Sequence, residues 1–288
     1  MSNIVLSLLW WQSLSLVSVL NTVFIGYYMY NNNTKLPDNQ KNLLSYSFIY
    51  TVVCGIRSFW PRKDVEQICF IDSRMSTPFV GRSLATIAEI FYVILIQNVY
   101  INLINFVSNY TKKDLNILKT MINKIYPLVL TAELCSWLGC ISKYYLWNTI
   151  EESLWMISSA LLVITSCLLY YIIEWYIPNK KIIYIKKLLN FIIIFGIPFV
   201  LFMATVDVPM YYNRWLTNIN GTYFEDFKEK NNKLTYQSLV EFDTCKKISK
   251  DYSIWRPEMP WLTGYFTMGV WSSYVIAIWY INFTNIKE

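Results

Sequence analysis

Acidic residues interrupt apolar segments of this sequence that are long enough to cross a lipid bilayer. Glu89 lies about two helical turns inside one such segment, Glu133 lies near the middle of the next, and Asp207 lies near the end of a later one. A charged side chain at the centre of a membrane helix costs about 2.5–3.5 kcal/mol on insertion scales. We therefore expect these carboxylates to face one another, basic partners or a wet cavity rather than lipid.

Basic and aromatic side chains accompany these acids. Arg57 and Arg82 lie near the ends of neighbouring apolar segments, where they can pair with the carboxylates and tune their protonation. Trp137 and Trp155 lie too deep for an interfacial belt, and carboxylates beside tryptophan faces suit a cation or a protonated amine. The alternative is a structural ion pair of Arg57 with Glu89 or Asp207 that only fixes helix register. The predicted ligand- or ion-binding residues are Glu89, Glu133, Asp207, Arg57, Arg82, Trp137 and Trp155.

Seven apolar segments supply the helices that must position these residues. The chain has 288 residues, of which 55% are hydrophobic and only 15% are charged. Its mean hydropathy is +0.32, and about 20 apolar residues suffice for one membrane-spanning helix. The predicted spans are 4–29, 42–60, 82–108, 120–143, 148–176, 188–212 and 260–283. We therefore predict an all-α, polytopic membrane protein, a seven-transmembrane-helix bundle that forms one domain over 1–288. Its one long outer loop, 213–259, joins the sixth and seventh helices.

Alternating helix direction brings most of the ionisable residues into the same half of the membrane. Arg57 closes the second span at the depth of the acids named above, whichever way the chain is oriented. Glu151 and Glu152 open the fifth span, where we interpret them as acids favoured by the positive end of the helix dipole. Glu258 and Asp72 are expected to be solvated acids of the connections. The predicted site therefore occupies one half of the bundle.

The distribution of basic residues predicts how the chain is oriented. If the N-terminus is outside, the short inner connections carry more Lys and Arg than the outer ones, as the positive-inside rule requires. We therefore predict an integral membrane protein with its N-terminus outside or lumenal and its C-terminus cytoplasmic. Cys69 and Cys245 would both lie outside, where they can form a disulfide. Asn220 begins a glycosylation sequon in the long loop.

Missing residue types exclude several functional classes. The sequence has no histidine, which removes His-based acid–base catalysis, His-containing triads and His-ligated metal sites. Its six cysteines form no CxxC motif, so neither a redox pair nor a zinc ribbon is indicated. No metal and no cofactor are predicted. The net charge of +6 does not indicate nucleic-acid binding, because the basic residues lie in short connections between apolar segments.

The chemistry of the predicted site favours one function over two alternatives. We expect a transporter or channel-like protein that binds a small cation, an amine or a proton-coupled solute in an acidic cavity in the outer half of the membrane. The first alternative is a membrane-embedded enzyme acting on a lipid or polyprenyl substrate, with Glu133 or Glu89 as general base. The second is a seven-helix receptor or assembly subunit. The expected partners are the lipid bilayer and a small cation or amine, with an oligomer or partner subunit in the last class.

Overall fold

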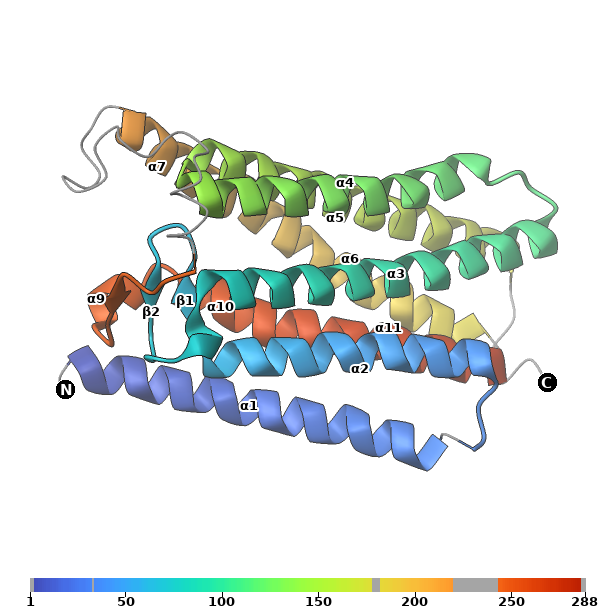
Figure 1. Cartoon of the computed structure of the whole chain (residues 1–288). Helices are drawn as coiled ribbons and strands as arrows, with labels where there is room; N and C mark the ends of the chain where they lie inside the picture. Colours follow the sequence, from blue (N-terminus) through green and yellow to red (C-terminus); the bar gives the residue numbers. More distant parts are fainter. Residues whose placement is uncertain (1–2, 33, 178–181, 220–242, 286–288) are drawn as a thin grey trace.

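The protein is a bundle of long helices whose axes run side by side (Figure 1). The computed structural model describes residues 3–32, 34–177, 182–219 and 243–285. The N-terminal end of the chain lies at the same end of the bundle as the short strands, and the C-terminal end lies at the opposite end (Figure 1). We call the end with the strands the cap end.

Each apolar segment of the sequence forms a helix over the predicted range, although the second and fourth helices end one residue earlier than predicted. The first five are α1 (Asn3–Asn32), α2 (Asp38–Phe59), α3 (Pro78–Thr111), α4 (Asn116–Ser142) and α5 (Tyr145–Tyr176). The sixth consists of α6 (Ile183–Phe202), a π-helical turn η3 (Met203–Asp207) and α7 (Val208–Ile219). The seventh consists of α10 (Met259–Gly264), a π-helical turn η5 (Tyr265–Gly269) and α11 (Val270–Asn285).

Five helical stretches are long and apolar enough to cross a membrane. They are α1, α3, α4, α5 and the stretch Ile183–Thr217, so the chain is a mostly helical, multi-pass membrane protein. α2 packs against α1 and α3, and α11 packs against α2 and α6, which places both within the same bundle. The sixth helix continues to Ile219 rather than ending at 212. The sequon at Asn220 lies outside the described residues.

Three two-residue strands form a small sheet at the cap end, which the all-α prediction did not include. β1 (Arg62–Lys63) pairs antiparallel with β2 (Ile68–Cys69), and β2 pairs in parallel with β3 (Lys247–Ile248). Strands this short carry no alternating pattern that a sequence can reveal. Together with the connection 60–77 and the short helix α9 (Tyr252–Trp255), they form what we call the cap.

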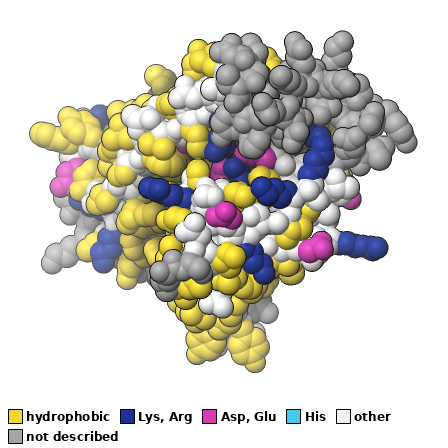
Figure 2. All heavy atoms as spheres, turned by 90° about the vertical axis from the view of Figure 1, so that its left-hand side faces the viewer, with side chains coloured by type: hydrophobic (Ala, Val, Ile, Leu, Met, Phe, Trp, Pro, Cys, Tyr) yellow, Lys and Arg dark blue, Asp and Glu magenta, His cyan; other side chains and the backbone are white. Residues whose placement is uncertain are grey.

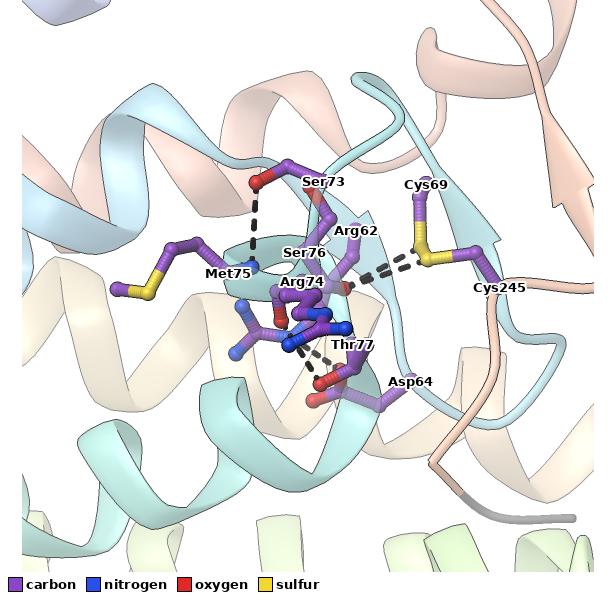
Figure 3. The surroundings of a disulfide bond; sticks show 9 residues. All are labelled: Arg62, Asp64, Cys69, Ser73, Arg74, Met75, Ser76, Thr77 and Cys245. Atoms are coloured by element: carbon purple, nitrogen blue, oxygen red, sulfur yellow. Dashed lines mark hydrogen bonds and ion pairs between the residues drawn. A yellow bond between two sulfur atoms is a disulfide. The ribbon is translucent and has the colours of Figure 1, made fainter.

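The predicted disulfide between Cys69 and Cys245 is present and fastens the cap (Figure 3). The two Cα atoms are 5.8 Å apart, and the Cys69 and Cys245 sulfur atoms lie 3.2 and 3.6 Å from the carbonyl oxygen of Ser76. The backbone N–H of Ser249 donates to the carbonyl of Cys69 at 3.0 Å. The chain that leads into α10 is thereby tied to the connection between α2 and α3.

Aromatic rings join the cap to α1. Trp255 and Phe70 are fully buried, and Trp10 of α1 stacks on Trp255 with ring centroids 6.4 Å apart. The ring centroids of Trp11 and Phe70 are 5.8 Å apart, so both Trp10 and Trp11 of α1 pack on the cap. Aliphatic side chains fill the opposite half of the bundle, among them Val99, Ile104, Ile122, Leu169 and Leu189. The polar residues are therefore concentrated in the cap half.

Candidate functional site: a buried acidic cavity

Arg82 is the centre of a buried ion network in the cap half. It lies just inside the N-terminal end of α3. Its Nη2 atom donates to both carboxylate oxygens of Glu133 at 3.0 Å and lies 3.5 Å from Oε1 of Glu89. Its Nη1 atom donates to Oε1 of Glu151 at 3.5 Å. One guanidinium group therefore faces carboxylates from α3, α4 and α5.

Thr86 and Trp137 complete the surroundings of Glu133. The hydroxyl of Thr86 donates to Oε2 of Glu133, and the indole N–H of Trp137 donates to the Thr86 hydroxyl at 3.0 Å. A carboxylate that accepts several hydrogen bonds is held strongly in its charged form. Trp137 therefore orients the ion network. The sequence predicted that Trp137 lines the cavity, but it is not among the described residues that do so.

Glu152 of α5 and Asp207 of η3 form a second acidic group. Both are buried, and their carboxyl groups lie within hydrogen-bonding reach of each other. Neither forms an ion pair with a described residue. No donor in the described part of the chain reaches Oε2 of Glu152 or Oδ2 of Asp207. A hydrogen bond between the two groups therefore needs a proton on one of them.

Arg57 does not form the predicted ion pair with Glu89 or Asp207. Its guanidinium carbon lies 5.1 Å from the ring centroid of Tyr265 and 5.5 Å from that of Phe266. Its Nε and Nη1 atoms have no hydrogen-bond partner among the described residues. The Tyr265 hydroxyl instead donates to Oε1 of Glu89 at 3.0 Å. The ring of Tyr265 thus separates the cation of Arg57 from the acid that it was expected to pair with.

A cavity of about 540 Å³ lies among these groups. Four of the predicted site residues line it, namely Arg57, Arg82, Glu89 and Trp155. The other three lie behind the lining. Glu133 contacts Arg82 and Asp207 lies beside Glu152, both of which line the cavity. Trp137 reaches Glu133 through the Thr86 hydroxyl. Glu151 and Glu152 also line the cavity. One cavity therefore adjoins both acidic groups.

Two π-helical turns shape this cavity. η3 ends at Asp207, and η5 runs from Tyr265 to Gly269. A Cβ atom at Gly269 would lie 2.8 Å from the hydroxyl oxygen of Tyr50, so glycine permits this close approach. Such turns occur frequently at functional sites because the extra residue redirects side chains. Both turns present site residues, and neither carries a signal in the sequence.

Charged side chains of the cap close the polar end of the cavity. Figure 2 shows basic and acidic side chains across the middle of the cap end. Lys63 lies 2.8 Å from Glu66 and 3.4 Å from Glu258. Arg214 of α7 lies 2.8 Å from Glu258. Glu258 is buried, so its prediction as a solvated acid was wrong, because the extension of α7 supplies a basic partner.

The ion pairs of the cap favour the charged forms of their members. Burial raises the pKa of the Glu66 carboxyl, but the nearby charges of Lys63 and Arg214 lower it by more. The pKa of Glu66 therefore lies below its usual value. Burial lowers the pKa of Lys63, whereas Glu66 and Glu258 raise it above its usual value. These groups therefore hold the cap together as ions over a wide range around neutral pH.

Arg62 packs directly against the beginning of α3. Its Nε atom donates to Oδ1 of Asp64 at 2.6 Å, and burial lowers the pKa of its guanidinium despite this partner. A Cβ atom at Gly81 would lie 1.3 Å from the guanidinium carbon of Arg62. Glycine at this position is therefore what lets the Arg62 side chain lie across α3 and roof the cavity.

The lining of the cavity includes residues that were not predicted as site residues, among them Glu151, Glu152, Tyr265 and Arg214. Glu151 and Glu152 were interpreted as acids at a helix start, but α5 begins at Tyr145, which places both acids inside the helix and buries them. A helix that starts at Tyr145 places Glu151 and Glu152 about two turns inside it, so the position of the helix start is the signal that identifies them as buried. Tyr265 and Arg214 stand in segments whose geometry depends on the π-helical turns and the cap, and no local pattern marks them.

The donor set of the site is one of carboxylates, guanidinium groups and hydroxyls. No group of three or more Cys, Asp or Glu side chains in the described ranges is arranged to hold a metal ion. No protein-family model, curated protein sequence or solved structure matches this chain. The chemistry of the cavity therefore carries the functional argument by itself.

Proposed function

We propose that the chain crosses its membrane seven times and acts as a transporter or channel-like protein for a small cation or protonated amine. The solute binds in the cavity, and binding is coupled to proton exchange. The observation that carries this proposal is the pair of Glu152 and Asp207. These two buried carboxyl groups form no ion pair within 4 Å with a basic group of the described residues, and Glu152 lines the cavity.

The charge balance around the cavity supports cation binding. Eight carboxyl groups surround the cavity but only five basic groups do. The carboxyl groups in the lining are those of Asp64, Glu66, Glu89, Glu151, Glu152 and Glu258, and those of Glu133 and Asp207 lie behind it. The basic groups in the lining are those of Arg57, Arg62, Lys63, Arg82 and Arg214. An ionised group without a partner is costly to bury, so the excess carboxyl groups either hold protons or bind a cation. A cation that reaches Glu152 replaces the proton that this residue shares with Asp207. Solute binding then releases a proton, and protonation releases the solute.

Aromatic rings support the same class of solute. Trp155 and Tyr211 line the cavity beside Glu152, and Tyr265 lines it beside Glu89. The faces of aromatic rings attract cations, by about 0.5–2 kcal/mol each. Carboxylates together with ring faces form a binding site that favours an ammonium group over an anion.

The position of the cap supports the proposed orientation. The cap contains a disulfide, and disulfides persist in oxidising, extracytoplasmic compartments. The N-terminal end of the chain lies at the cap end, and the C-terminal end lies opposite (Figure 1). We therefore infer an N-terminus outside or in a lumen and a cytoplasmic C-terminus, with α2 and the α10–η5–α11 helix as the remaining two crossings.

Arg57 favours a second candidate function, a membrane-embedded enzyme that acts on a lipid or polyprenyl substrate. Two of its guanidinium nitrogens have no acceptor among the described residues, and the oxygens of a phosphate group would satisfy them. Glu89 would then serve as general base. The excess of carboxyl groups around the same cavity disfavours an anion, so this candidate ranks second.

Binding of methylammonium to the full chain in lipid nanodiscs tests the leading proposal. Glu152→Gln keeps the size of the side chain but removes its charge. We expect binding to weaken roughly tenfold or more, because hydrogen bonds to charged groups contribute about 1.5–3 kcal/mol. Asp72→Asn, which neutralises an exposed acid of the cap, is the matched control and should bind like the unmodified chain. Equal affinities in all three proteins would refute the proposal.

A further inference from the structure

The cavity extends beyond its acidic end into an apolar compartment. The side chains that line this part include Ile96, Ile125, Leu162, Val163, Phe191 and Ile192. Along α5, the lining continues from Glu151 to Val163, a rise of roughly 18 Å at 1.5 Å per residue. A small ammonium ion fills only the polar end. The apolar part has the surroundings and the length that a hydrocarbon chain requires.

Two side chains of the lining, one on α6 and one on η5, are also exposed on the surface of the bundle. Phe195 of α6 and Met268 of η5 both line the cavity, yet they are 45% and 48% exposed. A Cβ atom at Gly264, which lines the cavity beside them, would meet no atom within 4 Å. The neighbouring side chains of Ile194 and Ile197 on α6 are also exposed. α6 lies in a candidate membrane span, so its exposed side chains face hydrocarbon.

We infer that the ligand of this cavity is a single-chain amphiphile with a protonated amine as its head group, and that it enters from the bilayer between α6 and η5. The head group lies against Glu152 and Glu151, and the hydrocarbon chain lies along α5 toward Leu162. This inference rests on the proposed function, since it names the class of amine that the acidic site binds. An opening toward lipid serves a solute that is itself dissolved in the membrane.

Ser159 offers a direct test of where the chain lies. It lines the cavity two helical turns beyond Glu152, on the same face of α5. Ser159→Phe should fill the path of the hydrocarbon chain and leave the acidic end open. Ile157→Phe, on the exposed face of the same helix, adds the same ring where it meets lipid and is the matched control.

The experiment compares methylammonium, octylammonium and octyl phosphate as probes of the full chain in nanodiscs. Empty nanodiscs measure the partitioning of each probe into lipid. After this correction we expect octylammonium to bind roughly tenfold or more tightly than methylammonium, because each buried methylene strengthens binding about fourfold relative to water. Ser159→Phe should abolish this advantage without changing methylammonium binding, and Ile157→Phe should change neither.

Association kinetics supply a second readout that does not depend on the Ser159 variant. Gly264→Leu places a side chain in the opening and should slow octylammonium association while leaving methylammonium unaffected. If methylammonium binds but octylammonium binds no more tightly, this inference fails and the proposed function stands. If neither amine binds, both fail. Tighter binding of octyl phosphate, lost in Arg57→Gln, would overturn the inference in favour of an anionic amphiphile.

Discussion

At the scale of single residues, the site depends on how one guanidinium group distributes its hydrogen bonds. Arg82 donates to both oxygens of Glu133 and reaches Glu89 and Glu151 at longer distances. It offsets only part of the negative charge around it. Glu152 and Asp207 stand apart from it, with their carboxyl groups close to each other and without an ion pair to a described residue. In the proposed function, the division between this paired acid and the unpaired acids Glu152 and Asp207 gives the cavity its chemistry.

Arg82→Gln tests this division by removing the basic partner of Glu133. Glu133 is almost completely buried, and an unpaired buried charge destabilises a protein by about 3–5 kcal/mol. We expect a large loss of thermal stability in detergent. Arg82→Lys should lose less, because it keeps the charge but not the planar fork of donors. Arg74→Gln changes an exposed arginine of the cap and should be neutral; a similarly small effect at Arg82 would contradict the network.

The convergence of these residues follows from the sequence, whereas their individual partners do not. Alternating helix direction predicts one shared depth, and Arg82 does meet Glu89 and Glu133 there. The choice between Arg57 and Arg82 as partner depends on side-chain packing. The ring that lies beside Arg57 is that of Tyr265, which belongs to η5 and not to the helices of Arg57 and Glu89, α2 and α3. Periodicity assigns a residue to a face of its helix, but it cannot assign the contacts that another helix makes there.

At the scale of elements, the helices are predictable and their irregularities are not. Apolar length alone gives the helical segments, but the π-helical turns at Met203–Asp207 and Tyr265–Gly269 have no compositional mark. The strands of the cap contain two residues each, too few for a periodic signal. These irregular elements place Tyr265 and Arg62 in the lining of the cavity and Asp207 behind it, beside Glu152. The elements that could not be predicted from the sequence are therefore elements that shape the site.

Gly81 tests the contact between the cap and α3. Gly81→Ala would place a methyl group on the guanidinium of Arg62, and we expect a loss of about 1–3 kcal/mol because the buried side chain must move. Gly26→Ala on α1 is the control, since the nearest atom, on Phe48, would lie at an ordinary 3.6 Å. That change should be neutral or stabilise by about 0.5–1 kcal/mol, as glycine is a poor helix former. Thermal unfolding that ranks the two variants the other way would contradict the packing.

Glu66 gives the cap a defined dependence on pH. Its pKa in the folded protein lies below the usual value because of Lys63 and Arg214, so its contribution to stability is complete above the unfolded pKa of about 4.3. That contribution disappears as the pH falls through the lower, folded pKa. The stability difference between the unmodified protein and Glu66→Gln should therefore be constant near neutral pH and shrink below about pH 4. A difference that does not change on acidification would show that the ion pair with Lys63 is not formed.

At the scale of the whole molecule, the bundle has two unlike halves. One half is filled with aliphatic side chains, and the other holds the carboxyl groups, the arginines and the cavity beneath a disulfide-linked cap. The close packing of the aliphatic half supplies the rigidity that keeps the buried charges of the other half at fixed distances. The cap half holds the cavity, and two of its lining side chains, Phe195 on α6 and Met268 on η5, are exposed on the surface. Composition predicts a membrane bundle with acids at one depth, but the cap and the cavity emerge only from the three-dimensional packing.

The measurement that tests the central claim most directly is proton release when methylammonium binds to the full chain in weakly buffered nanodiscs. If a cation replaces the proton shared by Glu152 and Asp207, each binding event should release up to one proton. Glu152→Gln, which cannot share its proton in the same way, should release none, and Asp72→Asn should release as many protons as the unmodified chain. Binding without proton release, or equal release from Glu152→Gln, would contradict the account.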